Sequence, residues 1–146
     1  MPADEDLPVI ELATPGPLRD SGVAAILAGR KTAMTGLRQL HEHAGDPVAE
    51  AGQRFVVLDS DGLPAAVIEM TEVRVVPINA VGDQYAHAEG RGYADVAQWR
   101  AAHEEFFRSE PVARFLGSVP EIDDDTLVIT MQFRLVHAVG RGIDSA

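Results

Sequence analysis

Residues 65–76 constrain the fold more than any other part of this sequence. Apolar side chains alternate along the first half of the segment and continue along its second half on the opposite parity, namely Ala66, Ile68 and Met70, then Val73 and Val75. A strand repeats every two residues, so both sets can face a core only if one extra residue lies between them. We therefore expect a β-bulge near Thr71 and Glu72, which bends a long strand in the way small barrels require.

Two further segments have strand patterns. Residues 54–59 predict a strand that joins the long strand through a hairpin turn at residues 60–64, where Asp61-Gly62 supplies the turn. Residues 127–135 alternate apolar side chains with Thr130, Gln132 and Arg134, which is typical of a half-buried strand.

Helical patterns flank these strands. Pro17 favours the start of a helix and Gly29 its end, with an apolar stripe made by Leu18, Val23, Ile26 and Leu27. Residues 94–108 give the clearest helix, and its expected buried face carries Val96, Trp99, His103, Phe106 and Phe107. A short helical piece around Leu37 and Leu40, a mixed segment at 79–92 and a linker with one helical turn at 110–120 complete the pattern.

The order of these elements does not alternate strand and helix. It predicts an α+β fold built on a small, curved, largely antiparallel sheet or barrel with flanking helices. We expect one domain over residues 17–137, a loose N-terminal arm at 1–16 that either hangs free or lies over the domain, and a C-terminal tail at 138–146.

The composition narrows the function classes. The chain has 146 residues, no cysteine and a net charge of −11, so we expect no disulfide, no Cys-ligated metal and no thiol nucleophile. The negative charge argues against non-specific binding to duplex DNA, which depends on Lys and Arg. No apolar run approaches a membrane span, and no charged-then-apolar leader opens the chain. We therefore expect a cytoplasmic protein with no membrane partner and no cofactor.

The segment Gly29-Arg30-Lys31-Thr32-Ala33-Met34-Thr35 is the strongest candidate for chemistry. Lys31 is the single lysine against eleven arginines, and it lies between two hydroxyls just after a predicted helix end. A lysine can act as a base or an electrostatic clamp, and a threonine can act as a nucleophile when a base lies beside it. Spacing alone favours a simpler interpretation, a helix end whose basic residues interact well with the dipole, because the pattern is short. The segment is not a phosphate-binding Walker loop, because that motif needs GxxxxGK[ST].

Other chemistry-bearing residues have two interpretations each. Glu69 points either into a cleft or to solvent, and Glu89 lies in a loop flanked by glycine. His103 and Trp99 are interpreted as core residues, with ligand contact as the alternative. His41 and His43 are expected on the surface, since two histidines are too few for a metal site.

Several ordered motifs together resemble the ASCH domain superfamily, in particular its longer bacterial branch, over about residues 18–137. The superfamily signature is a Gly-x-Lys-x-x-Thr-x-Arg run. The matching segments are Leu27-Ala28-Gly29-Arg30-Lys31-Thr32-Ala33, Val57-Leu58-Asp59 with Asp61-Gly62, Val67-Ile68-Glu69-Met70-Thr71-Glu72-Val73, Ala88-Glu89-Gly90, Trp99-Arg100 with His103 and Phe106-Phe107, and Phe133-Arg134-Leu135-Val136.

The resemblance implies a PUA-like β-barrel with a cleft suited to RNA or a nucleoside. One short bacterial member removes the acetyl group from acetylcytidine with a proposed Lys, Thr and Glu triad, and another is reported to cleave single-stranded RNA. Lys31 matches the triad lysine and Glu89 the glutamate. The family threonine lies three residues after the lysine, where this chain has Met34, so Thr35 and Thr32 are the candidate hydroxyls. Arg38 is nearest to the displaced signature arginine.

Three functions follow as hypotheses. The first is a nucleoside- or RNA-processing protein, in particular an amidohydrolase of a modified cytidine, with Lys31, Thr35 or Thr32, and Glu89 as catalytic candidates. The second is a module that binds a modified nucleoside or RNA without chemistry, and the third is a ribonuclease on single-stranded RNA. The candidate substrate-binding residues are Arg30, Arg38, Glu69, Trp99 and His103, and no metal is expected.

We also expect nearby carboxylates to outweigh burial and keep the pKa of Lys31 high. The sequence leaves the oligomeric state open.

Overall fold

A computed structural model describes residues 6–13 and 15–139, so arm residues 1–5 and 14 and tail residues 140–146 lie outside the described residues. The strands are β1 (Val9–Glu11), β2 (Ala33–Leu37), β3 (Arg54–Leu58), β4 (Pro64–Pro77) and β5 (Leu127–Ala138). The helices are α1 (Pro17–Leu27), α2 (Arg38–Ala44), α3 (Asp83–Ala88), α4 (Val96–Phe107) and α5 (Glu110–Leu116), with a 3-10 turn at Ile78–Ala80.

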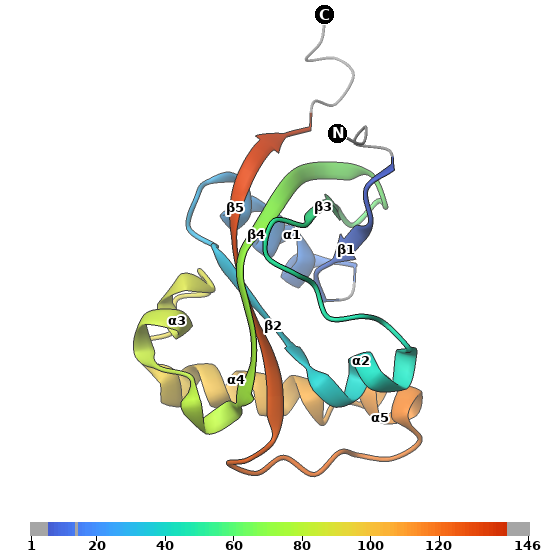
Figure 1. Ribbon diagram of the computed structural model, residues 1–146, viewed down its shortest axis with the longest axis vertical. Coiled ribbons are helices and arrows are strands. Elements are labelled where there is room, and N and C mark those ends of the chain that lie inside the picture. Colours follow the sequence, from blue (N-terminus) through green and yellow to red (C-terminus); the bar gives the residue numbers. More distant parts are fainter. Residues whose placement is uncertain (1–5, 14, 140–146) are drawn as a thin grey trace, which may run out of the picture.

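The five strands form one sheet in the order β1-β3-β4-β5-β2. The outer strand β1 runs parallel to β3, and every other neighbouring pair is antiparallel. The sheet curls around the long strands β4 and β5 into a half-barrel, with helices on its two faces (Figure 1). The predicted α+β class and the largely antiparallel, PUA-like curved sheet are confirmed. The barrel does not close, because β1 and β2 are the two edges of the sheet.

The predicted bulge lies in the middle of β4. Met70 pairs with Phe133 and Glu72 pairs with Gln132, so Thr71 is the extra residue without a cross-strand partner. The shift lets the apolar residues on both sides of it contribute to packing, and it bends β4 where the sheet curls. The phase change in the sequence therefore predicted a real structural feature.

Two hydrophobic cores lie on opposite faces of the sheet, since successive strand residues point to opposite faces. One core joins Val23 and Ile26 of α1 to residues of β3, β4 and β5 such as Ile129. The other joins Leu37 and Val128 to α3 and α4, with Trp99 and Phe107 at its centre. Figure 1 shows α4 and α5 crossing one end of the sheet and α1 lying behind the other end.

Some side chains differ from the expected helical faces. Leu18 and Leu27 are exposed, because the buried face of α1 runs instead through Arg19, Val23 and Ile26. Arg19 is buried because its guanidinium donates to the carbonyls of Leu12 and Ala13 and so fixes the segment after β1. On α4, Phe106 is 43% exposed whereas Phe107 is buried. None of the helices within residues 6–13 and 15–139 is long and apolar enough to cross a membrane.

Two strands were not predicted, and one helix is longer than the single turn expected. Residues of the expected arm form β1, the segment after Lys31 forms β2, and most of the expected linker at 110–120 is the helix α5. Tail residue Ala138 ends β5. The missed strand β2 matters most for function, because it carries Thr35 and forms a free edge of the half-barrel.

Candidate functional site

Lys31 reaches the interior because the chain turns sharply after α1. Gly29 adopts a φ of 80°, and the backbone amides of Arg30 and Lys31 both donate to the carbonyl of Ala25. The turn leads directly into β2 and leaves the Lys31 side chain 3% exposed. Its Nζ donates to the carbonyl oxygens of Ala33, at 2.8 Å, and Glu89, at 3.2 Å, and lies 3.6 Å from Oε1 of Glu89. A buried lysine with all its donors directed at acceptors is held rigidly.

Glu89 caps the C-terminal end of α3 and is followed by Gly90, which has a φ of 71°. The two segments of the site are in backbone contact here, since a Cβ on Gly90 would lie 2.7 Å from the carbonyl oxygen of Arg30 and 2.9 Å from Cα of Lys31. The amide of Thr32 also donates to the carbonyl of Ala88. Glycine is therefore required for Glu89 to approach Lys31.

The Glu89 carboxylate is the centre of a buried polar group that we call the Glu89 cluster. Its Oε2 accepts hydrogen bonds from the hydroxyl of Thr35 at 2.5 Å and the indole of Trp99 at 2.8 Å, and lies 3.2 Å from Nε2 of His103. The cluster consists of Lys31, Thr35, Tyr85, Glu89, Trp99 and His103.

Glu89 is ionised at neutral pH. Burial alone raises the pKa of Glu89, but the hydrogen bond and charge of His103, the charge of Lys31 and the hydrogen bond from Thr35 outweigh burial and hold that pKa at about 2. The carboxylate therefore accepts hydrogen bonds from its neighbours at all physiological pH values.

The pKa of Lys31 is shifted in the opposite direction to the expected one. Burial lowers the pKa of Lys31 more than the Glu89 charge raises it, and Arg91 lowers it further. The expectation that the carboxylates would win is therefore wrong. A single neighbouring carboxylate does not restore the hydration that an almost fully buried ammonium loses.

Tyr85 was not predicted from the sequence. Its hydroxyl donates to the carbonyl of Met34 at 2.6 Å, accepts from the amide of Met131 at 3.1 Å and lies 3.1 Å from the Thr35 hydroxyl, so it bridges β2 and β5 beside the cluster. Burial, followed by the Glu89 charge, raises the pKa of Tyr85 and keeps it protonated. Its position four residues before Glu89 puts both on one side of α3, which is the signal that could have identified it.

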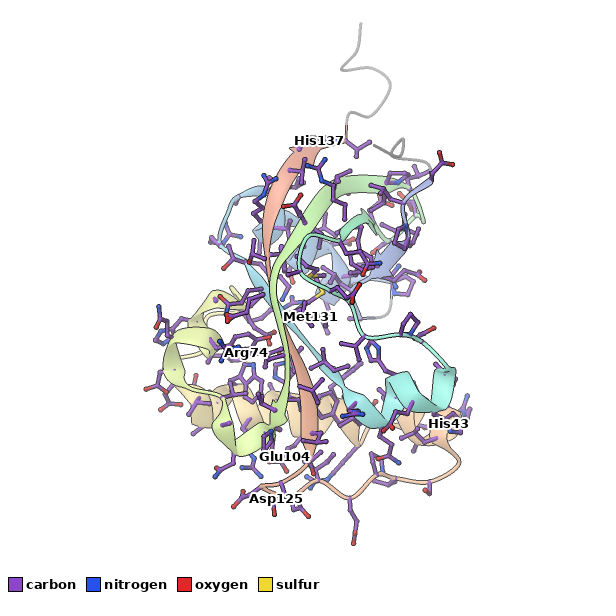
Figure 2. All side chains as sticks on the ribbon, in the orientation of Figure 1. His43, Arg74, Glu104, Asp125, Met131 and His137 are labelled. Atoms are coloured by element: carbon purple, nitrogen blue, oxygen red, sulfur yellow. The ribbon has the colours of Figure 1, made fainter. Side chains whose placement is uncertain are left out.

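Thr35 also borders an open cleft. Two cavities of about 530 and 320 Å³ lie along the free edge of β2 and share the residues Thr35, Gly36, His41, Asp46 and Phe106, and we call them together the edge cleft. The larger cavity lies between the two edges of the half-barrel, since residues of β1 and β2 both line it. Met131, which Figure 2 labels on β5 near the middle of the molecule, forms part of its wall. Within the Glu89 cluster, Thr35 is the member that lines the cleft.

The remaining candidates lie outside this arrangement. Thr32 is exposed, and its hydroxyl approaches the carbonyl of Ala88 at 3.5 Å. Arg30 is exposed, and Arg38 lies 3.9 Å from Glu42 on α2. Glu69 pairs with Arg54 at 2.9 Å and Arg134 at 3.3 Å, away from Lys31.

Trp99 and His103 belong to the Glu89 cluster and are largely shielded from solvent. Trp99 is fully buried, stacks on His103 with ring centroids 4.4 Å apart and meets the Tyr85 ring edge-on. Neither face of the indole is open to a ligand. The part of the chain that the structure describes contains no group of three His, Asp or Glu residues placed to hold a metal ion.

Comparisons with known proteins agree with the overall fold. A crystal structure of a protein from Enterococcus faecalis matches with a TM-score of 0.76 and 26% identity, covering 90% of this chain and 77% of that one. The ASCH domain of Lactobacillus crispatus matches with a TM-score of 0.70 and 30% identity, covering 81% of this chain and 72% of that one. The search of curated proteins finds no match. Because the sequence pattern of the ASCH domain family extends over residues 12–137, the chain belongs to that family.

Proposed function

We propose that this protein hydrolyses the amide bond of a small acylated nucleoside, with acetylcytidine as the representative substrate. One observation carries the proposal: Thr35 lines the edge cleft, and its hydroxyl donates to the buried, ionised carboxylate of Glu89 at 2.5 Å. A hydroxyl nucleophile needs a base or acceptor within this distance.

In the proposed reaction, the Thr35 oxygen attacks the acyl carbonyl and its proton moves towards Oε2 of Glu89. The carbon–nitrogen bond then breaks, and the proton passes to the leaving nitrogen, which departs as the free amine of the base. Water cleaves the resulting ester, releases the carboxylic acid and returns a proton to Thr35. The overall reaction consumes one water and needs no cofactor.

Lys31 acts in this proposal as a positioning residue. Its ammonium is buried, and its donors are directed at Ala33 and Glu89. Lys31 therefore fixes the position of the Glu89 backbone and carboxylate. This geometry does not favour an oxyanion clamp, which would require the Nζ to face the substrate.

The lining of the edge cleft favours an uncharged ligand. Among the described residues, neither a lysine nor an arginine lines either cavity, whereas Glu11 and Asp46 both do. A phosphodiester would bring negative charge towards Asp46, and the arginine beside this wall, Arg19, already pairs with Glu11. The cleft therefore gives little support to a ribonuclease.

A non-catalytic module that binds a modified nucleoside is the second candidate. The low pKa of Glu89 favours it, because a carboxylate with a pKa of about 2 is a strong hydrogen-bond acceptor but a weak proton acceptor. In this case Thr35 and Glu89 would recognise the acyl group without reacting.

Turnover of acetylcytidine by three proteins tests the proposal: the wild type, Thr35→Val and Thr32→Val. Valine keeps the shape of threonine and removes the hydroxyl. We expect Thr35→Val to lower kcat/KM by about a hundredfold or more, which corresponds to about 2.7 kcal/mol. Release of acetate and cytidine, followed by chromatography, gives the rate.

Thr32→Val is the matched control, because its hydroxyl is exposed and does not contact Glu89. It should keep kcat/KM within about threefold of the wild type, a difference below 1 kcal/mol. Equal losses in the two variants would contradict the assignment of Thr35. Acetylcytidine binding without any wild-type turnover would support the binding module instead.

A further inference from the structure

We infer that His41 is a ligand-binding residue of the edge cleft, and that it hydrogen-bonds the polar edge of a planar, uncharged base stacked on Phe106. The inference rests on the proposed function for its choice of ligand. It concerns recognition at the cleft, however, and holds equally for hydrolysis and for binding alone.

The position of His41 next to Thr35 depends on Gly36. His41 lies in the last turn of the short helix α2, which directly follows β2, and it lines both cavities. A Cβ on Gly36 would lie 2.9 Å from Nε2 of His41, so the imidazole packs over the bare backbone of the residue that follows Thr35. The ring is thereby placed at the part of the cleft that the two cavities share.

The imidazole has no partner among the described residues. Its Nδ1 is buried without a hydrogen bond. Among the described residues, Nε2 makes no hydrogen bond to a side chain or backbone group either. Buried polar atoms in folded proteins are almost always paired, and exceptions are commonly explained by function. Of the two ring nitrogens, Nε2 is not among the buried unpaired atoms, so it is the one suited to a ligand in the cleft that brings its own donor or acceptor.

Phe106 supplies a second part of the same site. Its side chain is 43% exposed, although its neighbour Phe107 is buried, and it lines both cavities. An exposed aromatic ring on a cleft wall stacks well on a heteroaromatic base. Trp99 is buried, and Phe107 lines the smaller cavity but is only 1% exposed, so Phe106 is the exposed aromatic residue of α4 on this cleft.

Binding of acetylcytidine in the Thr35→Val background tests the inference without hydrolysis. His41→Phe keeps a flat ring and removes both nitrogens, so we expect the Kd measured by titration calorimetry to rise by about tenfold or more. His43→Phe is the matched control, since His43 lies on the same helix, is exposed and contacts Phe115 without lining either cavity. Figure 2 shows His43 at the outer end of α2, and its variant should change the Kd less than about twofold.

A second measurement separates recognition from a structural role. The unfolding midpoint of His41→Phe should not fall, because the substitution removes an unpaired nitrogen and breaks no internal hydrogen bond. In the Thr35→Val protein with His41 in place, the 15N signals of the His41 ring should move on adding acetylcytidine. An unchanged Kd, or ring signals that stay in place, would overturn the inference even if Thr35 proves to be the nucleophile. If acetylcytidine binds through His41 but is not hydrolysed, the inference stands and the hydrolase proposal fails.

Discussion

At the scale of single residues, Glu89 shows how this fold keeps a carboxylate out of water. An isolated buried carboxylate is too costly to remain charged. Glu89 stays charged because its oxygens face a hydroxyl, an indole, an imidazole and an ammonium. Each of these groups has a nitrogen or hydroxyl next to the carboxylate, and Lys31 also donates to the backbone carbonyls of Ala33 and Glu89. The cluster is therefore coupled, and removing its centre affects every member.

This coupling predicts an acid-sensitive stability. The pKa of Glu89 is about 2 in the folded protein against an ordinary value of 4.5, so its contribution to stability is present above about pH 4.5 and is lost as the pH falls towards 2. At about 1.4 kcal/mol for each pKa unit, that contribution is on the order of 3 kcal/mol. Glu89→Gln should therefore flatten the acid limb of the free energy of unfolding, measured by urea titration between about pH 5 and pH 2.5.

Glu69→Gln gives the matched comparison. The hydrogen bonds of Arg54 and Arg134 lower the pKa of Glu69 too, but this carboxylate is near the surface and its ion pairs are screened. Its replacement should change the acid limb less than replacement of Glu89. If both variants reduce the pH dependence of the free energy of unfolding equally, the Glu89 cluster is not the acid-sensitive part of the fold.

At the scale of elements, the sequence predicted β4 better than β2. The bulge in β4 was foreseen because a break in apolar alternation over a long strand has one economical explanation. In β2, only five residues pair, and Met34 and Gly36 carry little strand signal, so the segment was expected to be a turn followed by a helix. The strand parity puts Thr35 on the Glu89 side and Met34 in the opposite core, which the spacing from Lys31 could not decide.

The residues of the site, like the strands, were predicted only in part. The motifs identified Lys31 and Glu89, which the fold brings within 3.6 Å of each other, but they also suggested Glu69, Arg30 and Arg38, which lie elsewhere. His41 was expected on the surface. Its place in the edge cleft could not be predicted, because that place depends on how the sheet curls. Contacts of this kind arise from tertiary packing, which a single sequence does not encode locally.

The junction of α3 with the turn before β2 gives a prediction at this scale. Gly90→Ala adds a methyl group against the backbone of Arg30 and Lys31, where neither neighbour can rotate away. We expect a loss of more than about 2 kcal/mol in the free energy of unfolding, because the positive φ alone costs roughly 1–2 kcal/mol. Trp99 is the single tryptophan, so its indole N–H signal should also shift as Glu89 moves.

Gly92→Ala is the control for backbone conformation. Gly92 has a φ of 82° but nothing within 4 Å of the position of an added Cβ, so this variant suffers the conformational cost without the clash. It should be the milder of the two and should leave the Trp99 indole signal in place. Equal destabilisation would mean that the contact between Gly90 and Arg30 does not hold the site together.

At the scale of the whole molecule, the acidic surface and the edge cleft point to the same kind of ligand. The net charge is −11, and most described arginines already face carboxylates and add little free positive charge. The paired arginines are Arg19, Arg38, Arg54, Arg74, Arg100, Arg108, Arg114 and Arg134. Long-range attraction of a polyanion requires a surface with unpaired positive charges.

This charge distribution predicts how ligand binding responds to salt. The affinity for acetylcytidine should change by less than about twofold between about 50 and 500 mM NaCl, since no ion is exchanged when an uncharged ligand enters an acidic cleft. Its 5′-monophosphate should bind more weakly at low salt, and the difference should shrink as salt screens the repulsion. Titration calorimetry of both ligands at each salt concentration gives these affinities directly. Tight binding of single-stranded RNA that weakens steeply with salt would contradict the prediction, because release of counterions on that scale requires a cluster of unpaired cations on the protein surface.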